Sequence, residues 1–175
     1  MAESEPQLSI FVDIMHAAEE PRLIEAITAP ESTGTVLAPT NFAFERMAAL
    51  LGVSLENFLR LPPQTLAEIV LYHIVPGHVI GATEFKHGDV LPTLSPSGQT
   101  LEVSFLESVL PVEYRSPTAH PTFVAVGSDA GVVSTVKADL EAGESLIHMI
   151  DHVLLPFAIA MPEIQTPLVQ AYGEP

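Results

Sequence analysis

Apolar residues in the first half of the chain recur at the spacing of helices. Between residues 8 and 19 they lie three or four positions apart, which predicts an amphipathic helix. Its apolar positions are Leu8, Phe11, Val12, Met15 and Ala18. Similar patterns predict four further helices, at residues 21–27, 41–51, 55–61 and 65–73.

The second half of the chain changes to the pattern of strands. A buried strand is already predicted at residues 35–38, where a short apolar run lies between Gly34 and Pro39. Later runs fall at 90–94, 100–105, 122–126 and 131–136, and a longer apolar stretch follows at 146–155. Helices followed by strands indicate the α+β class. The range 108–121, with three prolines, is predicted to be a long loop or an irregular sheet edge.

Residues 147–155 form a predicted strand that contains polar side chains. Alternation places His148, Ile150 and His152 on one side of it. The residues expected on the other side are Ile147, Met149, Asp151 and Val153. Asp151 then needs a partner inside apolar surroundings, either backbone amides or a hydroxyl. His148 and His152 would lie roughly 13 Å apart on a strand, too far to share an ion, so no metal site is predicted.

Composition narrows the classes of function. Residues are 47% hydrophobic and 16% charged, as in a folded domain, and no apolar run reaches the roughly 18 to 20 residues of a membrane span. With 22 acidic and 6 basic residues the net charge is −16, which excludes nucleic-acid binding and disfavours anionic membranes. Cysteine is absent, which excludes disulfides and thiolate chemistry. Neither a nucleophile elbow nor a glycine-rich phosphate loop is present, so no enzyme activity is predicted.

Three motifs resemble those of one known family. Residues 35–44, T-V-L-A-P-T-N-F-A-F, are similar to the first box of the fasciclin (FAS1) domain, T-V-F-A-P-T-N-x-A-F. Residues 147–156, I-H-M-I-D-H-V-L-L-P, resemble its second box, I-H-V-I-D-x-V-L-L-P. Between them, residues 71–77, L-Y-H-I-V-P-G, resemble its Tyr-His motif, L-x-Y-H-V-V-x-G. The motifs stand in the family's order, at the spacing of a single domain.

The resemblance implies a FAS1 fold, a small wedge-like β-sandwich with a flanking layer of helices. The domain is expected at residues 8–156, after an N-terminal extension at 1–7 and before a C-terminal tail at 157–175 packed on or near it. The boxes contain positions with a structural role. Thr40 or Asn41 is expected to cap a helix, and His148 and Asp151 belong to the second box.

The resemblance also implies a non-enzymatic interaction module for cell adhesion or extracellular-matrix contacts. Its partner would be a cell-surface or matrix protein or a glycan, bound by Tyr72, His73, Pro76 and Gly77. The alternative for Tyr72 and His73 is that both rings pack at a helix end and hydrogen-bond across the core. The implied location is secreted, cell-surface, periplasmic or luminal, with a targeting segment removed. A cytosolic location stays open, because the first residues lack the features of a signal peptide.

Two alternative functions remain open. One is a water-soluble carrier of a lipophilic ligand such as a carotenoid, which would then be the protein's cofactor. Its ligand-binding positions would be Phe42, Phe44, Leu66, Ile69, Val70, Ile74 and Val75. The opposing interpretation is that these apolar positions are simply core. The other alternative is an accessory subunit of a larger assembly, using residues 108–121 or the tail.

Overall fold

The computed structural model describes residues 5–18, 20, 33–104, 122–125 and 132–156. The predicted helix at 21–27, the loop at 108–121 and the tail at 157–175 lie outside these ranges. The described helices are the short 3₁₀ helix η2 (Pro6–Leu8), α1 (Ser9–Ala17), α3 (Asn41–Leu50), α4 (Leu55–Leu59) and α5 (Pro63–Tyr72). The described strands are β1 (Gly34–Pro39), β2 (Ile74–Pro76), β3 (Val90–Pro92), β4 (Thr100–Ser104), β5 (Thr122–Ala125), β6 (Val132–Ala142) and β7 (Ser145–Ile150). The mixture confirms the α+β class.

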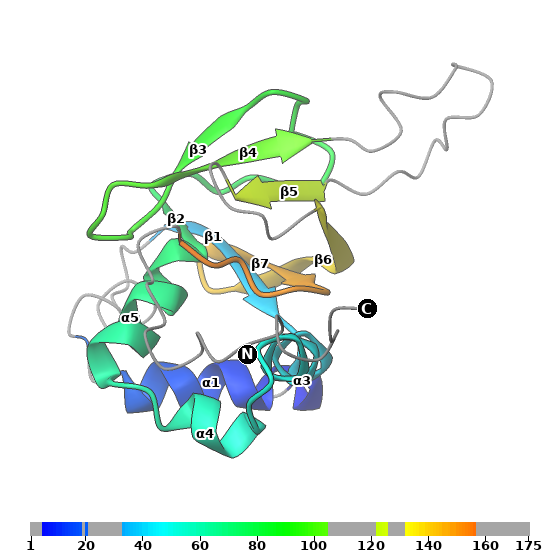
Figure 1. The fold of residues 1–175 in the computed structure, drawn as a ribbon. Helices are drawn as coiled ribbons and strands as arrows, with labels where there is room; N and C mark the ends of the chain where they lie inside the picture. Colours follow the sequence, from blue (N-terminus) through cyan, green and yellow to red (C-terminus); the bar gives the residue numbers. More distant parts are fainter. Residues whose placement is uncertain (1–4, 19, 21–32, 105–121, 126–131, 157–175) are drawn as a thin grey trace, which may run out of the picture.

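The strands form a sheet in the order β2-β1-β7-β6-β5-β4-β3. β1 and β7 pair in parallel, and the other pairs are antiparallel. β6 belongs to both halves, because residues 132–134 pair with β5 and residues 135–142 pair with β7. Two register shifts interrupt the pairing with β7. Figure 1 shows the result, with β3–β5 above the layer of β1, β7 and β6, and α1, α3 and α4 below it.

Alternation along β1 and β7 divides the interior into two cores. Val36, Ala38, Ile147 and Met149 face the helices. This helix-side core also contains Leu8, Phe11, Ile14, Phe44, Phe58, Leu66, Ile69 and Val70. The opposite face forms a second core under β3–β5, which contains Leu37, Tyr72, Val75, Phe85, Leu91, Leu101, Val103, Val133, Ile150 and Leu154. Each fully buried side chain of this size contributes roughly 1.5–3 kcal/mol, so the two cores account for the stability of the layers.

Polar side chains fix where the helices begin. Thr40 caps α3, since its Oγ1 accepts a hydrogen bond from the Ala43 amide at 3.3 Å. The Asn41 side chain binds a different element, because its Oδ1 accepts from the Ile10 amide and its Nδ2 donates to the Pro6 carbonyl, both at 3.0 Å. Of the two predicted cap residues, Thr40 therefore caps the helix, and Asn41 joins α3 to the start of α1.

The last strand is shorter than predicted. β7 ends at Ile150 rather than continuing to residue 155, because β6 turns away there to pair with β5. The Asp151 Oδ1 accepts from the Ser134 amide at 2.8 Å, and the Asp151 amide donates to the Ser134 carbonyl at 3.1 Å. The expected backbone partner of Asp151 is thus confirmed. The opposite orientations of His148 and Met149 are confirmed too, but the alternation does not extend to His152.

Candidate functional site

Tyr72 and His73 end α5 inside the molecule, and neither is exposed. The Tyr72 hydroxyl donates to the Thr100 carbonyl of β4 at 3.1 Å, and burial raises its pKa to about 12. The Leu154 amide donates to His73 Nε2 at 2.9 Å, so the ring hydrogen is on Nδ1, which donates to the Ile69 carbonyl at 2.7 Å. Burial lowers the pKa of His73 to about 4, only partly opposed by its bond to Ile69. The ring is neutral at pH 7.

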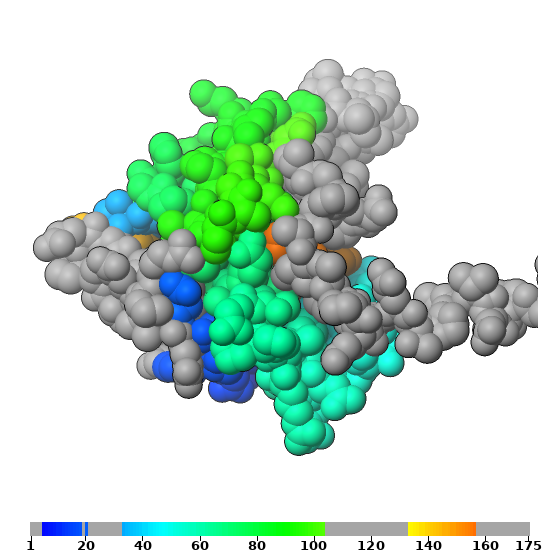
Figure 2. All heavy atoms as spheres, turned by 60° about the vertical axis from the view of Figure 1, so that its left-hand side comes forward, coloured from blue at the N-terminus to red at the C-terminus, as the bar shows by residue number. Residues whose placement is uncertain are grey.

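These contacts join α5 to the strands above it. Glu68 adds a second connection, because its Oε1 accepts from the hydroxyls of Ser95 and Ser97 at 2.6 and 2.8 Å. Figure 2 shows this side of the molecule, where the atoms of α5 meet those of the β3–β4 hairpin. Tyr72 and His73 are therefore out of reach of a partner in this structure. Tyr72 and His73 can therefore affect binding only indirectly, by positioning exposed residues. Their binding role stays a prediction.

The other two predicted binding residues lie at the surface. Pro76 is half-buried at the end of β2, and Gly77 is exposed in the turn that follows. Gly77 has φ of 70°, a conformation that favours glycine, and its amide donates to the Thr33 carbonyl at 2.8 Å. His78 and Val79 follow and are also exposed. Residues 76–79 are called the 76–79 surface below.

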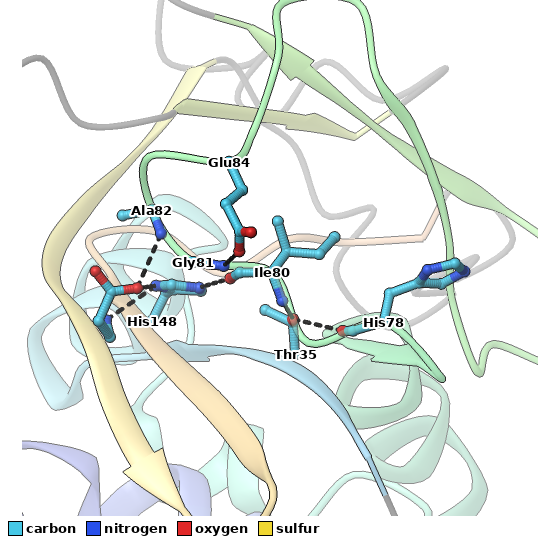
Figure 3. Close-up of polar contacts among 8 residues, drawn as sticks. Thr35, His78, Ile80, Gly81, Ala82, Glu84 and His148 are labelled. Atoms are coloured by element: carbon cyan, nitrogen blue, oxygen red, sulfur yellow. Dashed lines mark hydrogen bonds and ion pairs between the residues drawn. The ribbon is translucent and has the colours of Figure 1, made fainter.

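Thr35 holds this turn from below. It is fully buried in β1, and its Oγ1 donates to the His78 carbonyl at 2.7 Å. The same oxygen accepts from the Ile80 amide at 2.9 Å (Figure 3). One buried hydroxyl thus fixes the backbone on both sides of Val79. Thr35 belongs to the first box, but nothing in the sequence indicates which backbone groups it binds.

His148 and Asp139 hold the next residues. His148 Nε2 donates to the Ile80 carbonyl at 2.8 Å, and His148 Nδ1 accepts from the Asp139 amide at 3.2 Å. Asp139 lies at a register shift of β6 with φ of 56°, and its Oδ1 accepts from the Ala82 amide at 2.8 Å. Figure 3 shows these bonds converging on one short segment from neighbouring strands. The second box pointed to His148, but no local pattern in the sequence indicates Asp139, a strand residue with positive φ.

Comparison with known proteins agrees with the motifs. Residues 6–156 match the family model of the fasciclin domain. The chain belongs to the fasciclin domain family. It is 33% identical to Protein sll1483 of Synechocystis sp. over 148 residues, which is 83% of this chain and 67% of that protein.

A solved structure has the same fold. It is a FAS1 domain pair from the insect cell adhesion molecule fasciclin I, with a TM-score of 0.58 and 19% identity. The match covers 83% of this chain and 44% of that chain, so this FAS1 domain corresponds to less than half of the pair. At this identity the likeness establishes the fold, and the expected FAS1 fold is confirmed.

The residues proposed for a lipophilic ligand are not gathered in one lining. Phe42 is 64% exposed on α3, whereas the other six are buried. Phe44, Leu66, Ile69, Val70 and Ile74 belong to the helix-side core, and Val75 faces the second core. A ligand at these positions would have to displace core side chains. The carrier function itself stays a prediction.

Two further properties concern the described ranges only. None of their helices has the length and hydrophobicity needed to cross a lipid bilayer. Within the same ranges, no three His, Cys, Asp or Glu side chains come together as a metal site would require. The residues considered for an accessory-subunit role, 108–121 and the tail, lie outside these ranges.

Proposed function

We propose that this FAS1 domain is a non-enzymatic interaction module for cell adhesion or extracellular-matrix contacts, and that the 76–79 surface meets the partner. The proposal rests on two properties of this surface together: its side chains are exposed, and its backbone is held in place. Val79 is a large apolar residue with 43% of its surface exposed, beside the exposed His78. The backbone on both sides of it is bound by one buried hydroxyl.

Fixation matters because binding costs free energy when it orders a flexible loop. A turn already held in place avoids much of that cost, so a few exposed side chains suffice for contact. Tyr72 ends α5, and His73 lies directly before β2, the strand from which the turn starts, where its carbonyl accepts from the Leu37 amide of β1 at 2.9 Å. Their proposed part in binding is therefore to position the 76–79 surface.

The family supports an interaction role, and one solved structure of the same fold comes from an insect cell adhesion molecule. An extracytoplasmic location belongs to this proposal. The net charge of −16 favours a partner with basic residues over a sulfated glycan, because like charges repel across an interface. A basic cell-surface or matrix protein is the partner class we expect.

Adhesion to immobilised protein tests the proposal. Val79→Ser should reduce attachment of cells, or binding of basic matrix proteins, at least tenfold without lowering the melting temperature. Val136→Ser is the matched control, since Val136 is similarly exposed, at 54%, but lies on β6. An equal loss of binding in both variants would show that the partner does not bind specifically at the 76–79 surface. Failure of the wild type to bind any of these partners would overturn the adhesion function.

A further inference from the structure

The segment after the 76–79 surface covers the second core. Ala82 and Phe85 are buried, and Ile80 packs on the same cluster. The Phe85 ring contacts the His148 ring edge-on, with 5.5 Å between their centroids. Residues 80–85 are called the cover segment below. Its side chains Phe85 and Ile80 pack in the second core beneath β3–β5. Its backbone is hydrogen-bonded to side chains of β1, β6 and β7.

His148 can accept the Asp139 N–H only while it is neutral, whereas its Nε2 can donate to the Ile80 carbonyl in either charge state. Its Nδ1 accepts the Asp139 N–H, so that nitrogen carries no hydrogen and Nε2 carries the one donated to Ile80. A proton added to Nδ1 would face the Asp139 N–H, donor against donor. The Asp139 Oδ1 lies 4.0 Å from Nδ1, but it already accepts the Ala82 N–H at 2.8 Å. Turning the carboxylate toward the charged ring would therefore weaken the bond to Ala82.

The charged groups that face the His148 ring come from two of the elements packed against it. From β6 the facing charge is Asp139. From the β2–β3 connection the facing charge is Glu84, whose Oε2 accepts from the Gly81 amide at 2.7 Å, whereas the His78 ring points away from His148 (Figure 3). β1 contributes the uncharged Thr35 and Leu37, and β7 has no other charged residue. Burial lowers the pKa of His148, opposed in part by the bond to Ile80 and by the Asp139 charge.

We propose that His148 is an acid-sensitive latch, whose protonation draws the Asp139 carboxylate toward the ring and frees the Ala82 amide of the cover segment from β6. The release is confined to Ala82, because Thr35 and His148 Nε2 keep their bonds to Ile80. Its consequence, weaker partner contact in mildly acidic surroundings, rests on the proposed function. The latch thus adds a regulation of the contact surface to the adhesion role.

Amide protection, measured by NMR hydrogen exchange between pH 7.5 and 5 without any partner, tests the release. The reporters are the amides of Ala82 and Asp139, which donate to the latch residues. The reference is the Leu94 amide, which donates to the Ile74 carbonyl at 3.0 Å. After correction for the intrinsic rate, protection of the two reporters should fall at least tenfold relative to Leu94 as the His148 ring signals shift.

Three results would overturn the latch. One is a His148 ring that stays neutral down to pH 5, and another is a protonated ring with unchanged protection of Ala82 and Asp139. The third is an equal loss at Leu94, which would mean global unfolding. The range ends at pH 5 to stay above the ordinary carboxyl pKa of about 4. His73, with a pKa of about 4, also remains neutral there.

Two variants separate the latch from other effects. His148→Gln keeps an amide donor toward Ile80 without titrating, so protection of Ala82 should no longer depend on pH. If that variant does not fold, Asp139→Asn still offers a carbonyl oxygen to Ala82 but removes the charge, and the release should move to lower pH. Unchanged release in Asp139→Asn would contradict the proposed geometry. Since no partner is present, a failure of Val79→Ser to affect adhesion would leave the latch result intact.

Discussion

At the scale of single residues, burial decides what the histidines do. His73 has the sequence position of a binding residue, yet its ring is fully buried, and both of its nitrogens are bound to backbone groups. Its pKa in the fold, about 4, lies below the ordinary value of 6.5. The unfolded chain therefore binds a proton more readily than the folded one. Stability from this residue is complete above pH 6.5 and is lost as pH falls toward 4.

The loss has a measurable size. Between pH 7.5 and 4.5 the His73 effect should remove about 2–3 kcal/mol from the free energy of unfolding. The His73→Gln variant should be less stable than the wild type at pH 7.5. Because glutamine does not titrate, the free energy of unfolding of the variant should fall by about 2–3 kcal/mol less than that of the wild type between pH 7.5 and 4.5. Urea unfolding of both proteins at the two pH values gives the comparison. Equal pH dependence would mean that the His73 ring is accessible to protons in the folded state.

At the scale of elements, local sequence patterns predicted where helices and strands begin, but they did not predict which strands pair. Thr40 before α3 marked a helix start, and a run between Gly34 and Pro39 marked β1. The length of β6 was not predictable, because Lys137, Asp139 and Glu141 interrupt the apolar pattern that defines a strand. Those charges are tolerated because all three residues are exposed. Nor does any local signal indicate that Thr35, Asp139 and His148, far apart in sequence, hold one segment.

The end of β7 gives an element-scale prediction. Asp151 lies where β6 leaves β7 to pair with β5, and its carboxylate accepts a hydrogen bond from the Ser134 amide of β6 at 2.8 Å. Asp151→Ala should lower the free energy of unfolding by about 1–3 kcal/mol, because that amide is left without an acceptor. Asp151→Asn keeps an acceptor oxygen and is the matched control, with a smaller loss. Chemical unfolding measures both, and a neutral Asp151→Ala would mean that the junction is held by strand pairing alone.

At the scale of the whole molecule, the net charge of −16 affects both stability and binding. Among the described residues the Lys and Arg ion pairs are surface contacts such as Arg60–Glu56 and Lys137–Glu5, and each pair of this kind contributes at most about 1 kcal/mol. Six basic residues cannot offset 22 acidic ones. The folded chain therefore repels itself, while the same charge attracts a basic partner. Stability and binding should respond to salt in opposite directions.

This opposition can be measured on one protein. Raising NaCl from 10 to 500 mM shortens the Debye length from about 30 to about 4 Å, which screens the repulsion between exposed carboxylates. The melting temperature should rise, while the association rate with a basic partner falls at least tenfold. Glu141 and Glu144 are exposed near the β6–β7 turn, so Glu141→Gln/Glu144→Gln should stabilise the protein at 10 mM and have little effect at 500 mM. A gain of equal size at both concentrations would assign the effect to local hydrogen bonding, because a screened charge interaction must weaken with salt.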